Sequence, residues 1–234
     1  MLLIFPLAVI ASFRGKIKGG NFIYRLCHWW ADTWFLLIGI SHRNIFECPL
    51  VKDKQYIFIA NHISYLDIPI IFKSIRKRAI RVLGKMEMKK IPVFGFIYSK
   101  GAVMVDRSNA EQRAKSVLQL KSILRKGISI FIYPEGTFNE TKRPLKDFYD
   151  GAFRIAIETK TPIRPILFLD SFDRMHYQTI FSLNPGPSRA VFLEEVDVEI
   201  YSLNDIAALK NKVYVQMEKK LLEYRATWIS RENE

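Results

Sequence analysis

The stretch Gln55-Tyr-Ile-Phe-Ile-Ala-Asn-His-Ile-Ser-Tyr-Leu-Asp-Ile-Pro69 contains the change of pattern that decides the fold. It opens with the short apolar run Tyr56–Ala60, whose aromatic and branched residues predict a buried strand. Pro69 is tolerated only near the start of a helix, so a helix is expected directly after the polar residues. Strand, loop and helix in this order indicate an α/β fold, with the polar residues at the carboxyl end of a strand.

The same alternation continues along the chain and predicts the fold class. Strands are expected at Tyr56–Ala60, Ala79–Leu83, Ala102–Val105, Ile128–Tyr133, Ile163–Leu169, Ala190–Leu193 and Val196–Tyr201. Helices are expected at about Ile68–Ile75, Ala110–Lys126, Phe148–Thr159 and Asn204–Trp228. Buried runs that alternate with helices are typical of an α/β fold with a largely parallel central sheet flanked by helices.

Two apolar segments precede this pattern. The run Leu2–Phe13 is too short to span a bilayer, which takes about 20 residues, and its basic residues follow it, unlike those of a signal peptide. The aromatic-rich segment Asn21–Ile40 has one narrow polar stripe on a helix, made by Asn21, Arg25, His28 and Asp32. Residues 1–42 are therefore predicted to form two helices that dip into one membrane leaflet, ahead of an α/β domain at 43–234. A pair of core helices in a soluble fold is the alternative.

Composition indicates a folded and strongly basic protein. Apolar residues make up 49% and charged residues 25% of the chain, which excludes wholesale disorder. The 36 Lys and Arg against 23 Asp and Glu give a net charge of +13, which attracts nucleic acid, anionic lipid or a phosphorylated substrate or carrier. The sequence has no recognisable nucleic-acid-binding signature, which argues against the first of these partners. Cys27 and Cys48 lack metal-ligand spacing, so neither a metal site nor a disulfide framework is expected.

His62 and Asp67 carry the clearest catalytic pattern. With Asp67 in the first helical turn and His62 in the loop before it, the carboxylate can reach back to an imidazole nitrogen. Such a carboxylate fixes the tautomer and stabilises the imidazolium that forms when the other nitrogen takes a proton. The alternative is structural, with Ser64 and Asp67 capping the helix. A hydrolase with Ser64 as nucleophile is disfavoured, because Ser64 lies beside His62 in sequence and lacks the Gly-x-Ser-x-Gly elbow.

Two further motifs accompany predicted strands. Tyr133-Pro-Glu-Gly-Thr137 follows an apolar strand, which places Glu135 at the carboxyl edge of the sheet, beside His62 if the two strands are close. Gly136 permits a positive φ or a close approach to a ligand. The segment Lys100-Gly-Ala-Val-Met-Val-Asp-Arg107 ends in an arginine suited to bidentate contact with a phosphate. Taken alone, the first motif fits a surface turn equally well, and the second fits a surface salt bridge better.

In combination the motifs carry a family resemblance. Asn-His-x-Ser-x-x-Asp at 61–67, Gly-x5-Arg at 101–107, Pro-Glu-Gly-Thr at 134–137 and Thr-Pro-Ile-Arg-Pro at 161–165 follow the order and rough spacing of one family. The sequence resembles the glycerolipid acyltransferases, and most closely the bacterial 1-acyl-glycerol-3-phosphate acyltransferases, from about residue 55 to residue 169.

The resemblance implies an acyltransferase that needs no cofactor and no metal. It would move a fatty acyl group from acyl-CoA or acyl-acyl-carrier protein to the hydroxyl of a lysophospholipid, at the cytoplasmic face of the inner (plasma) membrane. His62 would be the general base, Asp67 would orient it, and Arg107 would bind the acceptor phosphate. The other substrate-binding residues expected are Gly101, Glu135, Gly136 and Thr137, together with Lys100, which is a candidate by proximity in sequence only.

Two departures from the family pattern keep other acceptors open. The family often has Phe before the Pro-Glu-Gly-Thr motif and Arg after it, whereas this chain has Tyr133 and Phe138. Without a cation at 138, a lyso-aminolipid or glycerol-3-phosphate acceptor remains an alternative, unless Lys142, Arg143 or Arg164 replaces that cation. The basic residues between 73 and 90 suit an anionic membrane or the donor's phosphates, and they also suit a non-catalytic basic membrane-binding protein.

Overall fold

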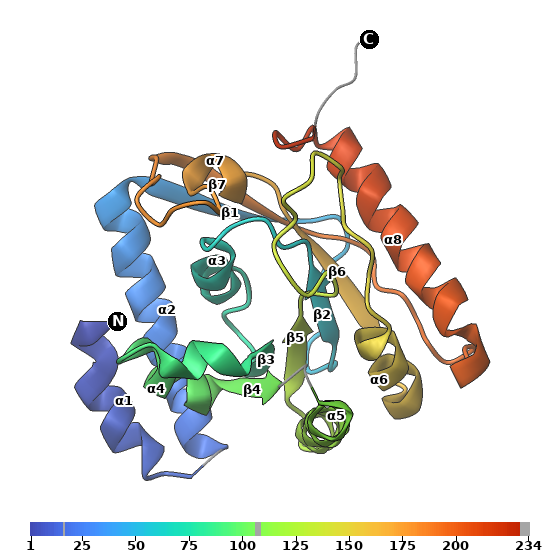
Figure 1. Cartoon of the computed structure of the whole chain (residues 1–234), viewed down its shortest axis with the longest axis horizontal. Coiled ribbons are helices and arrows are strands. Elements are labelled where there is room, and N and C mark those ends of the chain that lie inside the picture. Colours follow the sequence, from blue (N-terminus) through green and yellow to red (C-terminus); the bar gives the residue numbers. More distant parts are fainter. Residues whose placement is uncertain (16, 106–108, 230–234) are drawn as a thin grey trace.

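The centre of the molecule is a mixed, largely parallel sheet. The structure, a computed structural model, describes residues 1–15, 17–105 and 109–229. Within them the sheet has seven strands in the order β1-β7-β6-β2-β5-β3-β4 (Figure 1). These are β1 (Ile40–Phe46), β2 (Ile57–Ala60), β3 (Ile80–Lys85), β4 (Ala102–Val105), β5 (Ser129–Ile132), β6 (Ile163–Phe168) and β7 (Gly186–Phe192). Strands β2 to β6 are mutually parallel, whereas β1 and β7 run the opposite way because β7 joins β6 antiparallel.

Helices cover both faces of the sheet, as expected for the fold class. The helices are α1 (Phe5–Ser12), α2 (Lys18–Ile38), α3 (Asp67–Ser74), α4 (Phe94–Gly101), α5 (Ala110–Leu124), α6 (Gly151–Thr159), α7 (Ser171–Arg174) and α8 (Ile206–Glu223). Helices α5, α6 and α8 lie on one side in Figure 1, and α1 to α4 lie on the other. Short 3-10 turns occur at Leu2–Ile4, Met86–Lys90 and Leu203–Asp205. The predicted α/β fold with a largely parallel sheet is confirmed.

Strand β2 shows why its sequence is apolar without interruption. Successive side chains of a strand point to opposite faces, and both faces of this sheet are covered. Ile57 and Ile59 pack in the cluster that includes α5, α6 and α8, while Phe58 and Ala60 pack in the cluster that includes α2 and α3. All four residues are fully buried. The strand therefore holds its carboxyl end, where the polar residues begin, at a fixed place in the centre of the sheet.

Two strand predictions need correction. The segment Val196–Tyr201 is not a strand, because its pairing with Ile163 stops at one bridge and the Asp197 side chain then accepts the N–H of Glu199 in a turn. Strand β1 was not predicted, since its polar centre gives no buried run. It lies at the edge of the sheet, pairs only with β7 and alternates in burial.

The two N-terminal helices form as predicted, but most of the polar stripe of α2 contacts the protein: His28 is buried, while Arg25 is exposed. Asn21 accepts a hydrogen bond from Arg81 at 2.8 Å, and Asp32 is paired with Lys73 and Arg76 at the end of α3. Helix α2 also exposes apolar side chains, among them Leu36 at 80% and Leu37 at 78%. Among the described residues, no helix combines the length and apolarity that crossing a membrane requires. The boundary expected at residue 42 falls within β1.

Candidate active site

His62 lies in the loop between β2 and α3, at the carboxyl edge of the sheet, and Asp67 is the first residue of α3. The Nδ1 atom of His62 is 2.8 Å from Oδ2 of Asp67. Within the described residues, no hydrogen bond of the His62 Nε2 atom is present. The imidazole is partly exposed, with 16% of its side chain accessible, while Asp67 is fully buried. Asp67 therefore holds one nitrogen and leaves the other to face a ligand.

Asp67 also shapes the loop that carries His62. Its Oδ2 atom accepts the backbone N–H groups of Ile63 at 2.8 Å and Ser64 at 3.0 Å, in addition to the imidazole. The carboxylate thus folds back over the loop and makes no cap for the helix. Ser64 accepts the N–H of Leu66 and donates its hydroxyl to the carbonyl of Met175, and it is fully buried. These bonds leave Ser64 unsuited to act as a nucleophile.

Glu135 holds the backbone of His62 from the neighbouring strand. Strands β2 and β5 pair in parallel, so the Pro-Glu-Gly-Thr motif after β5 lies beside the loop after β2. The carboxyl oxygens of Glu135 accept the N–H of His62 at 2.8 Å and the N–H of Lys146 at 2.9 Å. The N–H of Asn139 reaches the carbonyl of His62 at 2.6 Å. Both backbone polar groups of the proposed base are therefore fixed by one connection, residues 133–150.

Two aromatic rings fix the plane of the imidazole. Tyr133 stacks on His62 with ring centroids 3.9 Å apart and planes 12° apart, and its hydroxyl donates to the backbone carbonyl of Asp67 at 3.1 Å. Phe138 meets the same imidazole edge-on at 4.4 Å. Position 138, where the family pattern has a cation, is thus occupied by a packing contact with the base. The sequence singled out Tyr133 and Phe138 as departures from the family pattern. Their contact with His62 could not be predicted, because it depends on the pairing of β2 with β5.

Burial changes the protonation of Glu135. The residue is 2% exposed, and desolvation raises its pKa to about 8, against the opposing effect of the backbone N–H groups of Lys146 and His62. The nearby carboxylate of Asp67 adds to the rise. Glu135 is therefore largely protonated at neutral pH, with both of its oxygens engaged by the backbone. This arrangement makes Glu135 a positioning residue for His62.

The other predicted substrate residues fall into three groups. Gly136 has a positive φ of 75° and lies in the turn beside Glu135, and Thr137 is exposed next to it. Lys100 and Gly101 end α4 and precede β4, so they lie at the amino edge of the sheet, away from His62. Arg107 lies outside the described residues.

Lys146 is a cation at the site that sequence reasoning missed. Its Nζ atom donates to Thr137 Oγ1 at 2.6 Å and to the carbonyl of Phe138 at 3.3 Å, and no carboxylate pairs with it among the described residues. Lys142 and Arg143 are exposed on the same connection. Arg164 does not replace the missing cation, since it is buried near the amino end of β6 and donates to the carbonyl of Cys48.

Comparison with known proteins agrees with this geometry. The family model described as Acyltransferase matches residues 43–169, more than half of the chain and all of the motifs above. The chain belongs to the acyltransferase family. This acyltransferase is 29% identical over 224 residues to the 1-acyl-sn-glycerol-3-phosphate acyltransferase of Haemophilus influenzae, covering 95% of this chain and 90% of that protein. It is 29% identical over 183 residues to the enzyme of the same name from Salmonella typhimurium, covering 76% and 73% of the two chains.

The fold of this acyltransferase also has a solved counterpart. The crystal structure of the 1-acyl-sn-glycerophosphate (LPA) acyltransferase PlsC from Thermotoga maritima superposes with a TM-score of 0.75. The match covers 96% of this chain and 90% of that chain, at 20% sequence identity. The likeness extends over the N-terminal helices as well as the sheet.

Proposed function

We propose that this acyltransferase moves a fatty acyl group from a thioester to the free hydroxyl of 1-acyl-glycerol-3-phosphate, which gives phosphatidic acid. The observation that carries the proposal is the His62–Asp67 pair, with Nδ1 bound to the carboxylate at 2.8 Å and Nε2 directed away from it. An imidazole held in this way suits proton transfer from a hydroxyl. The names of the relatives support the choice of acceptor.

The chemistry follows from the arrangement of these groups. His62 Nε2 takes the proton from the acceptor hydroxyl as its oxygen attacks the thioester carbonyl, and the buried carboxylate of Asp67 stabilises the resulting imidazolium. The tetrahedral intermediate then collapses, the carbon–sulfur bond breaks, and the imidazolium returns the proton to the leaving thiolate. The new ester and a free thiol are the products, and the imidazole is regenerated without a cofactor.

Binding of the acceptor phosphate is assigned to two cations, Arg107 and Lys146. Arg107 is the proposed bidentate partner, with Lys146 as a second cation that Thr137 holds in place. The positive φ of Gly136 forms the turn that precedes Thr137. Glu135 supports the site by holding the backbone of His62.

A panel of acceptors and donors tests the activity. Purified protein is assayed with 1-acyl-glycerol-3-phosphate, a lyso-aminolipid and glycerol-3-phosphate, each with acyl-CoA and with acyl-acyl-carrier protein. The proposal expects the highest kcat/KM with 1-acyl-glycerol-3-phosphate. A higher value with either other acceptor overturns the choice of acceptor, and failure to acylate any of them overturns acyl transfer itself.

We further propose that α1 and α2 seat the enzyme on a membrane, at the cytoplasmic face of the inner membrane. Apolar side chains that no protein neighbour covers support this proposal. The most exposed are Leu2, Leu3, Ile10, Phe13, Trp29, Leu36 and Leu37. Both substrates carry fatty chains, so a leaflet is where the enzyme would meet them.

Replacing Leu36 and Leu37 by serine tests the membrane contact without removing the core residues of α2. Burying one leucine contributes about 1.5–3 kcal/mol, so the pair should lower partitioning onto phospholipid vesicles at least about tenfold. Leu118→Ser with Leu222→Ser is the matched control, because these exposed leucines lie on α5 and α8. Equal flotation of the α2 variant and wild type would place the anchor elsewhere.

A further inference from the structure

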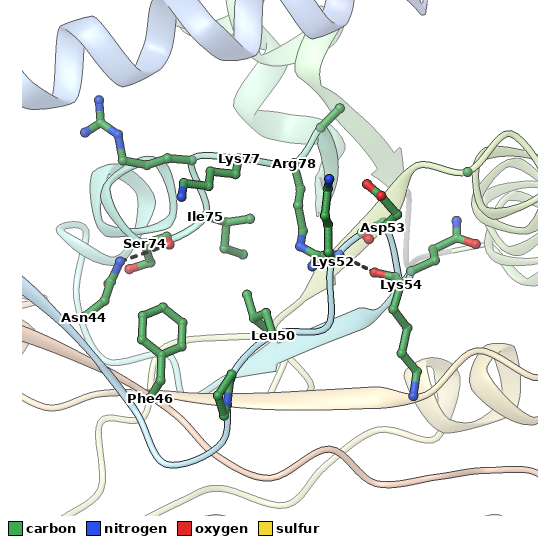
Figure 2. Close-up of a pocket in the computed structure, with 16 residues that line it drawn as sticks. Asn44, Phe46, Leu50, Lys52, Asp53, Lys54, Ser74, Ile75, Lys77 and Arg78 are labelled. Atoms are coloured by element: carbon green, nitrogen blue, oxygen red, sulfur yellow. Dashed lines mark hydrogen bonds between the residues drawn. The ribbon is translucent and has the colours of Figure 1, made fainter.

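A cavity lies at the amino edge of the sheet, at the other end of α3 from His62. Its volume is about 940 Å³. Three connections line it: the segment from β1 to β2, the segment from α3 to β3, and the turn before β5. Figure 2 shows Phe46, Leu50 and Ile75 in its interior, with Lys77 and Arg78 above them and Lys52 and Asp53 to one side. This amino-edge cleft shares no residue with the catalytic loop.

Two of the basic residues of the cleft are neutralised by carboxylates. Arg76 makes two hydrogen bonds of 2.7 Å to Asp32 of α2. Lys54 pairs with Glu195 and turns away from the cleft in Figure 2. These two cations are therefore committed to holding the walls of the cleft in place.

The other cations of the cleft keep their charge. The Arg78 guanidinium donates to the backbone carbonyls of Val51 and Lys54, which are neutral acceptors. Lys52 and Lys77 are exposed, and neither makes an ion pair or a hydrogen bond with the described residues. Against these three cations the lining offers one uncommitted carboxylate, that of Asp53. The cleft thus concentrates positive charge above an apolar interior.

We propose that the amino-edge cleft binds a phosphate monoester that carries an apolar group. A dianionic phosphate would lie among Lys52, Lys77 and Arg78, and the apolar group would cover the exposed parts of Phe46 and Leu50. Such a ligand is a phosphatidic-type lipid, which shares its phosphate chemistry with inorganic phosphate. The cleft adjoins α2 through the Arg76–Asp32 pair, which favours the lipid. The site does not depend on acyl transfer, because it lies away from His62.

Lysine acetylation followed by mass spectrometry tests this site directly on the full chain. Dihexanoyl phosphatidic acid and inorganic phosphate are the probes, at matched ionic strength. The proposal expects acetylation of Lys52 and Lys77 to slow about fivefold or more, while Lys212 and Lys219, exposed on α8, react as before. Protection by the lipid at lower concentration than inorganic phosphate supports the proposal, and equal protection by both overturns the part assigned to the apolar group.

A charge variant sharpens the test. Asp53 has a positive φ of 58°, a conformation that asparagine tolerates, so Asp53→Asn removes the opposing charge without straining the backbone. In this variant, the concentration of dihexanoyl phosphatidic acid that gives half of the full protection of Lys52 and Lys77 should be about threefold lower. The proposal is overturned if neither probe protects Lys52 and Lys77, or if all four lysines slow equally, which would indicate a general ionic effect. If Asp53→Asn needs the same concentration of the lipid as wild type for half of the full protection, the placement of the phosphate in the cleft is overturned.

Discussion

The two ends of helix α3 use charge in opposite ways. At its first residue, Asp67 is fully buried, and one of its oxygens accepts three hydrogen bonds. Beyond its last residue, Lys77 is exposed and makes no ion pair with the described residues, beside the equally exposed Lys52. One end fixes a single geometry, and the other leaves charge available for a ligand.

The charge at one end of α3 positions the imidazole, whereas the charge at the other end can attract an anion. A buried carboxylate is costly unless it is bonded, so the bonds of Asp67 hold both it and the imidazole in one orientation. Exposed lysines contribute little to stability, and their side chains remain free to meet an anion. Substitutions at the catalytic end of α3 should therefore change turnover. Substitutions in the amino-edge cleft should change only the binding of a phosphate-bearing ligand there.

The largest effect is expected for His62→Ala. Loss of the general base should lower kcat by roughly two to four orders of magnitude, because proton transfer contributes about that much. The fold should survive, since the residue lies in a loop and its backbone bonds remain. His176→Ala, in the loop after α7, is the matched control and should keep wild-type kcat. Near-normal turnover by folded His62→Ala protein would end the proposed mechanism.

Asp67→Asn should have the next largest effect. The amide oxygen can still accept N–H groups, but the charge that stabilises the imidazolium is gone, so kcat should fall about ten- to a thousandfold. KM for both substrates should change little. Asp32→Asn is the control, because this partly exposed aspartate pairs with cations at the opposite end of α3. If the two variants lose activity equally, the contrast between the ends of α3 is wrong.

Arg107→Lys sharpens the contrast between a cation assigned to the acceptor phosphate and the cations of the amino-edge cleft. The substitution keeps the charge and loses the planar fork, and hydrogen bonds to charged groups contribute about 1.5–3 kcal/mol. KM for 1-acyl-glycerol-3-phosphate should rise about ten- to a hundredfold, with the KM of the donor little changed. The exposed Arg125, at the end of α5, provides the control variant Arg125→Lys. A rise in the donor's KM alone would assign Arg107 to the thioester instead.

The sequence was sufficient to predict the pairing of His62 with Asp67, because both lie on one continuous strand, loop and helix. It also placed Glu135 near His62, but the role of Glu135 depends on the pairing of β2 with β5, which no local pattern shows. Strand β1 escaped prediction because an edge strand needs no continuous apolar run. The amino-edge cleft could not be predicted either, since three distant connections build it.

The smallest expected effect concerns the pH dependence of stability at the catalytic end. Burial raises the pKa of Glu135 to about 8, above its ordinary value of 4.5. Between these values the folded state holds a proton that the unfolded state has lost, so the free energy of unfolding contributed by Glu135 falls as pH rises. The slope is at most about 1.4 kcal/mol per pH unit.

Glu135→Gln isolates this contribution, because glutamine does not titrate. Its NH2 group cannot accept a hydrogen bond, so one of the two backbone N–H groups, from His62 or Lys146, loses its partner at a cost of about 1–3 kcal/mol. In urea unfolding the variant should therefore be less stable than wild type at pH 5, and the gap should narrow up to pH 8. Glu140→Gln, at an exposed position of the same connection, should show no such trend. A gap that stays constant from pH 5 to pH 8 would mean that the two N–H groups hold Glu135 as a carboxylate in the folded protein. The catalytic end of α3 would then carry two buried negative charges, those of Asp67 and Glu135.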